Sequence, residues 1–458
     1  MSQIFDAIVV GAGQAGPSLA TSLAGKGWKV AMVERKLFGG TCVNNGCTPT
    51  KAMVASAHAA HLARRGADFG VNAGPVSVDF RAVKARKDKI VLDSRTSVEK
   101  WVRGTQNCTV FTGTATFASP TTMRVGDDVL EAPKIFLNVG ARPHTPNMPG
   151  VDSVPFLTST TILDLEQLPE HLIIVGAGYV GLEFAQMFRR FGSQVTVVDK
   201  SSRLAPHEEE DASNVIREIF ESESIGVRIN ANCIHLEKDG NQVAVGLECS
   251  DGAPRVLGSH ILLAVGRVPN TDDLNLAAAG ITPDERGFIP VDDQLRTSVP
   301  GIFAVGDCNG RGAFTHTSYN DYEIVAENLL DGASRRLSDR IPASALYIDP
   351  PLANIGMNEA EVRATKKHAL IGKRAMTRVG RAIEKGETYG FIKVLVDAET
   401  RHILGATVFG TGGDEAIHCI LTAMYARQPA SLLTHSVHIH PTVAELIPTT
   451  FEDLKPLE

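Results

Sequence analysis

Cys42 and Cys47 stand with four residues between them in the segment of residues 39–51, which reads Gly-Gly-Thr-Cys-Val-Asn-Asn-Gly-Cys-Thr-Pro-Thr-Lys. Two thiols this close can cycle between a disulfide and a dithiol and so relay two electrons to an acceptor. Thiol exchange proceeds through the thiolate, so such a pair needs a nearby base or positive charge. The alternative is a pair of inert buried thiols, and the surrounding elements decide between the two.

The elements before the thiol pair form a dinucleotide-binding pattern. A strand is expected over residues 4–10, a helix up to about residue 26, and a second strand over residues 29–33 that ends at Glu34. The turn between the first strand and the helix carries the glycines Gly11, Gly13 and Gly16. These glycines allow a tight turn, close approach of the backbone to a pyrophosphate, and packing of helix on strand, while the acid accepts from ribose hydroxyls.

The same pattern occurs a second time. A strand over residues 173–175, a helix to about residue 191 and a strand over residues 194–198 end at Asp199, and each acid lies 23 residues after the first glycine of its turn. The second set of glycines is Gly176, Gly178 and Gly181. Two such units predict two bound nucleotides. Together with the thiol pair they indicate an electron path from a nicotinamide through a flavin to a disulfide.

Asp199 also bears on the choice of coenzyme. Its carboxylate is expected to bind the ribose 2′-hydroxyl and to repel a 2′-phosphate, which favours NADH over NADPH. Lys200 and Arg203 follow within four residues, and either cation is able to bind a phosphate, so NADPH stays the alternative.

Length and composition exclude several classes of protein. With 458 residues the chain is expected to form two or three domains, and a net charge of -7 gives no basic field for nucleic acid or a membrane surface. No apolar run is long enough to span a bilayer and no signal peptide is recognised, so a cytoplasmic protein is expected. Seven cysteines in this length argue against an extracellular disulfide framework.

These motifs, taken in order, resemble those of the pyridine nucleotide-disulfide oxidoreductases, which include dihydrolipoamide dehydrogenase, glutathione reductase and mercuric reductase. The resemblance covers essentially the whole chain. It is carried by residues 39–51, 139–143, 178–183, 265–270, 302–307 and 440–445. It implies an α/β fold with two Rossmann-like domains, one for FAD and one for NAD(P), followed by an α+β dimerisation domain. The implied limits are 1–150 with 270–335 for FAD, 151–269 for NAD(P) and 342–458 for the dimer interface.

The resemblance also implies roles for the thiols. Cys47 corresponds to the thiol that forms a charge-transfer complex with the flavin, and Cys42 to the outer thiol that attacks the substrate. His440 corresponds to the base, with Glu445 orienting its imidazole. In relatives this histidine reaches the thiols of the other subunit, which implies a homodimer.

Further roles follow from the resemblance. Lys51 and Glu183 match a pair near the flavin N5, Asp307 matches the acid that binds the ribityl chain, and Tyr179 resembles the side chain that covers the flavin until nicotinamide displaces it. The other residues implied at the cofactors are Gly40, Thr41 and Gly140 for FAD and Gly266 for NAD(P). Without this context Lys51 reads as a solvated charge and Glu183 as an acid on a helix surface.

The remaining histidines and cysteines receive plainer interpretations. His435, His438 and His440 crowd one segment, but no cysteine or carboxylate is spaced to complete a tetrahedral metal shell, so no metal is expected. His316 is expected near the flavin or in a packing role. Five cysteines are interpreted as structural, and Cys308 is also expected near the flavin: Cys108, Cys233, Cys249, Cys308 and Cys419.

The electron acceptor is the least determined feature. Several segments resemble mercuric reductase-like proteins and the reactive chlorine resistance flavoproteins, yet no cysteine follows Cys419, so the C-terminal pair of mercuric reductases is missing. The expected acceptor is a small-molecule disulfide or a thiol-bound metal ion. Dihydrolipoamide dehydrogenase is the runner-up. A flavin-dependent NAD(P)H oxidase or redox sensor is the alternative of a different class.

Overall fold

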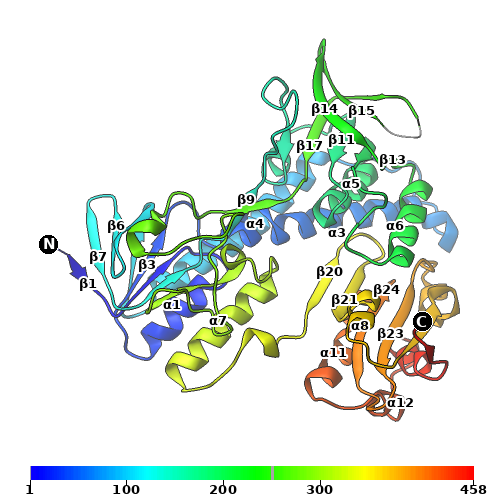
Figure 1. The fold of residues 1–458 in the computed structure, drawn as a ribbon. Helices are drawn as coiled ribbons and strands as arrows, with labels where there is room; N and C mark the ends of the chain where they lie inside the picture. Colours follow the sequence, from blue (N-terminus) through cyan, green and yellow to red (C-terminus); the bar gives the residue numbers. More distant parts are fainter. Residues whose placement is uncertain (1, 249–251) are drawn as a thin grey trace.

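The computed structural model describes residues 2–248 and 252–458, and Cys249 lies outside this range. Figure 1 shows three bodies: an amino-terminal sheet drawn in blue and cyan, a green unit beside it, and an orange and red carboxyl-terminal unit reached through a yellow strand. The long helices α3 and α4 extend from the first body towards the second. Each body contains its own sheet.

The first body is a five-stranded parallel sheet in the order β19-β8-β2-β3-β4. Its strands are β2 (Ala7–Val10), β3 (Val30–Glu34), β4 (Cys108–Thr112), β8 (Ile135–Leu137) and β19 (Ile302–Ala304). The central strand β2 is fully buried, as expected for a parallel strand covered on both faces. Its helices are α1 (Gly16–Gly25), α2 (Gly40–Asn45), α3 (Cys47–Arg64), α4 (Phe80–Arg103) and α7 (Thr315–Leu330).

A smaller four-stranded sheet adjoins this body. Its strands are β1 (Gln3–Ile4), β5 (Ala115–Ser119), β6 (Thr122–Val125) and β7 (Asp128–Glu131). The expectation of one strand over residues 4–10 is therefore wrong, because Ile4 pairs with Glu131 in this sheet and β2 begins only at Ala7. Asp6 marks the break, since its carboxylate accepts from the Lys29 backbone N–H at 2.7 Å.

The second body repeats the arrangement with the parallel order β10-β17-β11-β12-β13. Its strands are β10 (Leu157–Thr158), β11 (His171–Val175), β12 (Gln194–Val198), β13 (Gly226–Arg228) and β17 (His260–Leu263), and its helices are α5 (Tyr179–Phe191) and α6 (Glu210–Ser222). An antiparallel sheet of β14 (Asn232–Asp239), β15 (Gln242–Glu248) and β16 (Arg255–Gly258) projects from it. Strands β9 (Ala141–Pro143) and β18 (Arg267–Pro269) pair between the first two bodies.

The third body is a six-stranded antiparallel sheet in the order β20-β21-β24-β23-β22-β25. Its strands are β20 (Ala343–Leu346), β21 (Leu352–Gly356), β22 (Ala369–Ala375), β23 (Phe391–Asp397), β24 (Ile403–Phe409) and β25 (Lys455–Pro456). Its helices are α8 (Glu359–Ala364), α9 (Gly380–Glu384), α10 (Gly413–Ala416), α11 (His418–Tyr425), α12 (Ser431–Thr434) and α13 (Ile447–Thr450). The fold class expected from the sequence is confirmed: two dinucleotide-binding units and a carboxyl-terminal α+β unit.

Aromatic packing joins the first two bodies. Phe80 of α4 lies against Phe188 and Phe191 of α5, with ring centroids 5.9 and 5.8 Å apart. Met53 and Ala57 of α3 belong to the same buried cluster. This contact brings one face of α3 against α5, so side chains on these two helices meet although they are more than 100 residues apart in the chain.

A polar cluster lies close to this apolar contact. The buried Arg190 guanidinium of α5 pairs with Glu223 at 2.7 Å and with Asp349 at 2.6 Å. His58 Nδ1 of α3 lies 2.6 Å from Asp349. Burial opposes ionisation of Asp349, but the hydrogen bond to His58 and the charge of Arg190 hold its pKa well below the usual range. The cluster therefore ties α3, α5 and the loop before β21 together through charge.

Candidate active site

The loop that carries the thiols begins against the first dinucleotide turn. Gly39 and Gly40 have φ of +91° and +60°, the left-handed region that favours glycine. A Cβ on Gly40 would lie 2.7 Å from the Cα of Gly13, so only glycine allows this approach. Gly46 separates α2 from α3, and a Cβ there would lie 2.7 Å from the Thr41 carbonyl oxygen. These contacts fix the thiol loop beside the first turn.

The two thiols share a hydrogen bond at the point where α2 ends and α3 begins. Cys47 is the first residue of α3, and its Sγ lies 3.3 Å from the Thr315 hydroxyl, the first residue of α7. Both thiols are free in this structure. A thiol at a helix N-terminus lies where the helix dipole favours a negative charge.

The environment separates the two thiols by acidity. The hydrogen bond from Cys42, followed by that from Thr315 and the charge of Lys51, lowers the pKa of Cys47 to about 6. The same hydrogen bond, with burial and the charge of Cys47, raises the pKa of Cys42. In the dithiol state Cys47 is therefore the thiolate and Cys42 the protonated donor.

A partly buried ion pair lies one helical turn beyond Cys47. Lys51 Nζ lies 2.6 Å from Glu183 Oε2, with the Glu183 side chain 6% exposed. The other Glu183 oxygen accepts from the Tyr347 backbone N–H at 3.0 Å. Lys51 also lies over the Tyr347 ring, 4.6 Å from its centroid. The interpretation of Glu183 as an acid on a helix surface is therefore wrong, because the packing of α3 on α5 buries its carboxylate, whereas Lys51 is half-buried and paired with it.

A cleft of about 1150 Å³ connects these groups. This volume exceeds the ~300–1,000 Å³ typical of a small-molecule site and suits an extended dinucleotide. Twelve of the residues expected at the cofactors or the chemistry line it: Gly11, Gly13, Glu34, Gly40, Thr41, Cys42, Cys47, Lys51, Gly140, Tyr179, Glu183 and Asp307. The first dinucleotide turn, the thiols and the ion pair thus face one continuous space.

The lining of the cleft fits FAD. Asn44 Oδ1 and Asn45 Oδ1 are buried acceptors without a hydrogen-bond partner among the described residues, and both residues line the cleft. Gly140, which also lines the cleft, has nothing within 4 Å of a Cβ position and leaves open space for a ligand, and the start of α1 faces the cleft at Gly13, where a helix N-terminus favours a pyrophosphate. At the other end, burial raises the pKa of Asp307, and the charge of Arg267 opposes that shift. A ligand that donates hydrogen bonds and carries a pyrophosphate suits this surface.

The glycines of the second turn divide into two groups. A Cβ on Gly176 would lie 2.4 Å from the Ala264 carbonyl oxygen, and one on Gly181 would lie 2.0 Å from that of Gly176, so both serve close packing. In the first turn Gly16 does the same against Gly11, at 2.1 Å. Gly178, by contrast, has nothing within 4 Å of a Cβ position and leaves open space for a nucleotide.

Asp199 lies at the end of β12, as expected. One carboxylate oxygen accepts from the Ala177 backbone N–H at 2.6 Å and the other from Ser201 N–H at 2.7 Å. The corresponding Glu34 accepts from Ala12 N–H at 2.7 Å. Lys200 is exposed, and Arg203 donates to the Pro206 carbonyl. Gly266 leaves open space, like Gly178.

His440 and Glu445 form a pair away from the thiols of their own chain. His440 Nδ1 lies 2.9 Å from Glu445 Oε2, and the His440 side chain is 81% exposed. Of the residues that the structure describes, those that line the cleft include neither member of this pair. Val437 and Ile439, next to the histidine, are 100% and 80% exposed. This segment therefore presents a paired imidazole together with bare apolar side chains.

The other cysteines and histidines are resolved individually. Cys308 is fully buried and faces the Leu137 and Val305 carbonyls, so it has a packing role. Cys108 and Cys419 are half-buried, whereas Cys233 is exposed on β14. His316 lines the cleft and stacks on Phe314. Within residues 2–248 and 252–458, no three His, Cys, Asp or Glu side chains are grouped to hold a metal ion.

Sequence reasoning missed several residues of the site. Thr315 contacts Cys47, and Tyr347 contacts both members of the ion pair. Asn138 donates to the Gly11 carbonyl at 3.0 Å and so fixes the first turn. The buried Asp321 accepts from Gly306 N–H and thereby holds the turn that carries Asp307. None of these belongs to a local motif, and each contact spans more than 10 residues of sequence.

A dinucleotide cleft that ends on a thiol pair defines a flavoprotein disulfide reductase. Residues 5–321 match the model of the family "Pyridine nucleotide-disulphide oxidoreductase", and residues 342–451 match its dimerisation domain. The chain therefore belongs to the pyridine nucleotide-disulphide oxidoreductase family. Members are FAD-dependent enzymes that use NAD(P)H, and the dimerisation domain implies a homodimer.

Relatives are similar over nearly their whole length. The chain is 35% identical to a mercuric reductase of Streptomyces lividans over 97% of this chain and 94% of the relative. It is 34% identical to RclA of Escherichia coli, described as a probable pyridine nucleotide-disulfide oxidoreductase, over 98% and 99%. A solved structure of the HOCl-induced flavoprotein disulfide reductase RclA in complex with Cu(II) has a TM-score of 0.89, 33% identity, and covers 98% of this chain and 99% of that one. A dihydrolipoyl dehydrogenase of Chlamydia trachomatis is 30% identical over 97% and 96%.

None of the helices in the described part of the chain combines the length and apolar character needed to cross a membrane.

Proposed function

We propose that this enzyme passes two electrons from NADH through FAD to the Cys42–Cys47 disulfide and from the resulting dithiol to a small-molecule disulfide or a thiol-bound metal ion. The observation that carries the proposal is the difference in acidity between the two thiols at the end of a dinucleotide cleft. The cofactors supply hydride acceptance and storage of two electrons. The limits given above for the three domains belong to the same proposal.

The two thiols divide the work. In the reductive step the Cys42–Cys47 bond breaks, two electrons and one proton enter, and Cys47 remains as the thiolate while Cys42 holds the proton. Cys42 then loses its proton and attacks the acceptor sulfur, which forms a mixed disulfide and releases one thiol. Attack of Cys47 on Cys42 closes the internal disulfide and releases the second thiol. Lys51, paired with Glu183, adds positive charge on the Cys47 side of the cleft.

The proton of Cys42 needs a base, and we assign this role to His440 of a second copy of the chain. His440 is exposed, is oriented by Glu445, and stands beside bare Val437 and Ile439. A second copy of the chain would cover these apolar side chains and receive the imidazole at its own thiols. This supports a homodimer with two shared sites, in which a monomer lacks the base.

Asp199 supports NADH as the coenzyme. Its carboxylate is fixed at the end of β12 by two backbone N–H groups, which leaves a negative charge where a 2′-phosphate would lie. Lys200 and Arg203 have no carboxylate partner among the described residues, so NADPH is the alternative that the coenzyme test below compares directly.

The acceptor class follows from the thiols and from the relatives. Thiolates bind soft metal ions, and relatives include a mercuric reductase and a Cu(II) complex of RclA. Residues 420–458 include no cysteine that could hand Hg(II) to the inner thiols. We therefore place reduction of disulfides or copper ahead of mercury. Similarity to dihydrolipoyl dehydrogenase keeps lipoamide as the runner-up.

The testing experiment is an anaerobic titration of the purified holoenzyme with NADH and, separately, with NADPH. A long-wavelength thiolate–flavin band after two electrons supports the relay, and lipoamide, glutathione disulfide, Hg(II) and Cu(II) are then compared as acceptors. Cys42→Ser should abolish acceptor reduction, while Cys233→Ser, a change at an exposed thiol that does not line the cleft, should not. Direct bleaching without the band, with turnover kept in Cys42→Ser, would instead identify an oxidase or sensor.

A further inference from the structure

A carboxylate behind the wall of the cleft accepts a hydrogen bond from the hydroxyl of Tyr179. Tyr179 is the first residue of α5 and lines the cleft. Its hydroxyl donates to Glu208 Oε1 at 2.5 Å, and its ring centroid lies 6.4 Å from that of Phe314. Burial, together with the charge of Glu208 and this hydrogen bond, raises the pKa of Tyr179, so the phenol stays protonated and keeps donating.

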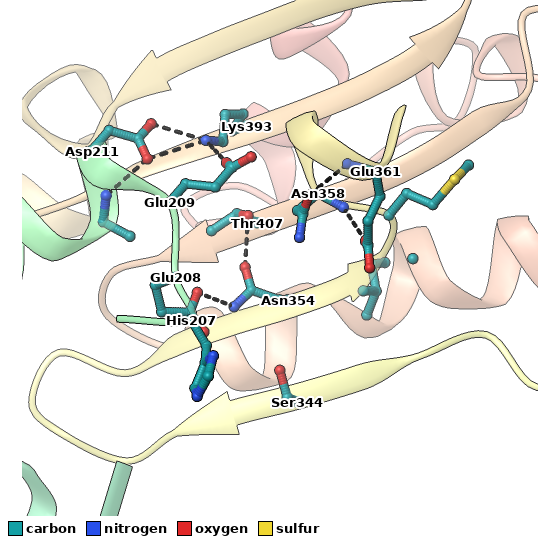
Figure 2. A pocket seen from close by; sticks show the side chains of 15 residues that line it. His207, Glu208, Glu209, Asp211, Ser344, Asn354, Asn358, Glu361, Lys393 and Thr407 are labelled. Carbon is teal, nitrogen blue, oxygen red and sulfur yellow. Dashed lines mark hydrogen bonds and ion pairs between the residues drawn. The ribbon is translucent and has the colours of Figure 1, made fainter. Parts of the chain in front are cut away.

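Glu208 is held in turn by the carboxyl-terminal sheet. Its second oxygen accepts from Asn354 Nδ2 of β21 at 2.8 Å, and Asn354 Oδ1 accepts from the Thr407 hydroxyl of β24 at 2.7 Å (Figure 2). Among the described residues its hydrogen-bond donors are Tyr179 and Asn354, and no cation pairs with it. The negative charge of Glu208 is therefore directed at the tyrosine hydroxyl.

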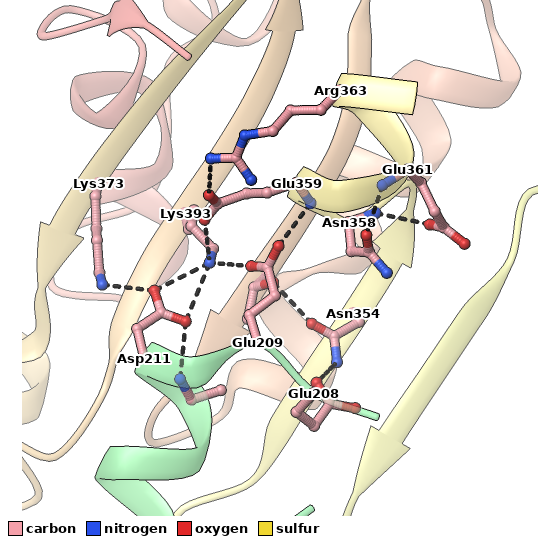
Figure 3. A network of polar contacts seen from close by, with 12 residues as sticks. Glu208, Glu209, Asp211, Asn354, Asn358, Glu359, Glu361, Arg363, Lys373 and Lys393 are labelled. Atoms are coloured by element: carbon pink, nitrogen blue, oxygen red, sulfur yellow. Dashed lines mark hydrogen bonds and ion pairs between the residues drawn. The ribbon is translucent and has the colours of Figure 1, made fainter. Parts of the chain in front are cut away.

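The segment next to Glu208 is fixed by a buried cation. Lys393 is 2% exposed and binds Glu209, Asp211 at 3.0 Å and Glu359 at 2.9 Å (Figure 3). Glu209 immediately follows Glu208 in the chain. Because removing one partner of such a network leaves a buried charge unpaired, the backbone at this point resists displacement. Of the two ends of the Tyr179–Glu208 hydrogen bond, Glu208 is the fixed one.

Space lies behind this hydrogen bond. A cavity of about 170 Å³ is lined by Glu208, and it shares Ser344, Asn354 and Ile355 with the large cleft (Figure 2). Tyr179 lines the large cleft but not this cavity. The Tyr179–Glu208 hydrogen bond therefore joins a residue that lines the cleft to one that lines the small cavity.

We propose that Glu208 is a positioning residue that latches Tyr179 in its resting place, so that entry of the nicotinamide must break the Tyr179–Glu208 hydrogen bond. This inference rests on the proposed function, in which NADH reaches the flavin through the cleft. The latch opposes nucleotide entry without acting on the reacting atoms. Loss of the latch is therefore expected to tighten apparent NADH binding and to leave the rate at saturation unchanged.

The test is anaerobic stopped-flow reduction of the flavin by NADH in the holoenzymes of wild type, Glu208→Gln and Tyr179→Phe. Because hydrogen bonds to charged groups are strong, the NADH concentration for half-maximal rate should fall at least about tenfold in Tyr179→Phe, and by a smaller factor in Glu208→Gln, whose amide oxygen still accepts. In Glu208→Gln the limiting rate should stay within about twofold of wild type. The double variant should match Tyr179→Phe, because Tyr179→Phe already removes the hydrogen bond that Glu208→Gln weakens.

Glu361→Gln is the matched control. Glu361 is a carboxylate that lines the same small cavity but caps α8 through Asn358, so its change should leave the half-maximal concentration unaltered. An unchanged or raised half-maximal concentration in both Glu208→Gln and Tyr179→Phe would overturn the latch. If wild-type flavin is not reduced by NADH or NADPH, the proposed function fails instead. If Glu208→Gln does not fold, the half-maximal NADH concentration of Tyr179→Phe decides whether the latch exists.

Discussion

Replacing Cys42 by alanine and by serine separates two roles that this residue has in the structure. Both changes remove the redox disulfide, but serine keeps a hydroxyl that can donate to the Cys47 thiolate, whereas alanine does not. The hydrogen bond from Cys42 is the largest of the effects that lower the pKa of Cys47 to about 6, ahead of Thr315 and Lys51. A donor stabilises the charged form of its acceptor, so its loss must raise the pKa of Cys47.

The magnitude follows from the strength of such bonds. A hydrogen bond to a charged group contributes about 1.5–3 kcal/mol, and about 1.4 kcal/mol corresponds to a tenfold change in proton affinity. Cys47 is accessible from the cleft, so we expect the lower end of this range. The pKa of Cys47 should therefore be about one unit higher in Cys42→Ala than in Cys42→Ser. Thr315→Ala, made in the Cys42→Ser background, should raise the pKa of Cys47 by a smaller amount.

The assay is the rate of alkylation of Cys47 by iodoacetamide in the holoprotein, followed by mass spectrometry of the Cys47 peptide between about pH 5 and pH 9, because the thiolate is the reactive form. The alkylation rate of exposed Cys233 in the same samples is the internal control. Coincident midpoints in Cys42→Ala and Cys42→Ser would refute the donor role of Cys42. A larger change from Thr315→Ala than from the loss of Cys42 would refute the order of effects.

Three further predictions follow from other parts of the structure. His440→Ala should lower acceptor turnover by about 10²–10⁴-fold while single-turnover flavin reduction by NADH stays within about twofold, and equal loss of both would contradict the role of a base. Arg190→Met should destabilise the fold by about 3–5 kcal/mol in urea unfolding, since it leaves buried carboxylates unpaired. The pKa of Asp349 is depressed in the folded state, so the ionised carboxylate stabilises the fold above its ordinary pKa near 3.8, and this stabilisation is lost as the pH falls. The difference in unfolding free energy between wild type and Arg190→Met should therefore shrink in acid. A difference that stays constant with pH would contradict the pairing. Gly46→Ala should lower turnover at least about tenfold by displacing the thiol loop, whereas Gly25→Ala in α1, where a Cβ has open space, should not, and equal effects would remove the steric argument.

Local features were predictable because their signals lie within a few residues. Strand β12 has the bounds expected from its apolar run, and α5 ends at Phe191 as expected. The bounds of the strand expected over residues 4–10 were not predictable, because the sheet that Ile4 joins depends on Glu131, a residue far along the chain. Exposure of Cys233 likewise depends on the projecting position of β14.

The sequence by itself determined the class of enzyme, because two glycine turns with acids 23 residues beyond their first glycines and a thiol pair in one short segment each encode a backbone conformation and a chemistry locally. Tertiary structure alone decided which thiol is the more acidic and what surrounds it. Thr315 reaches Cys47 across 268 residues, and Glu208 reaches Asn354 across 146. Such contacts arise only when the three bodies pack together, since no local conformational preference records which distant side chain will arrive.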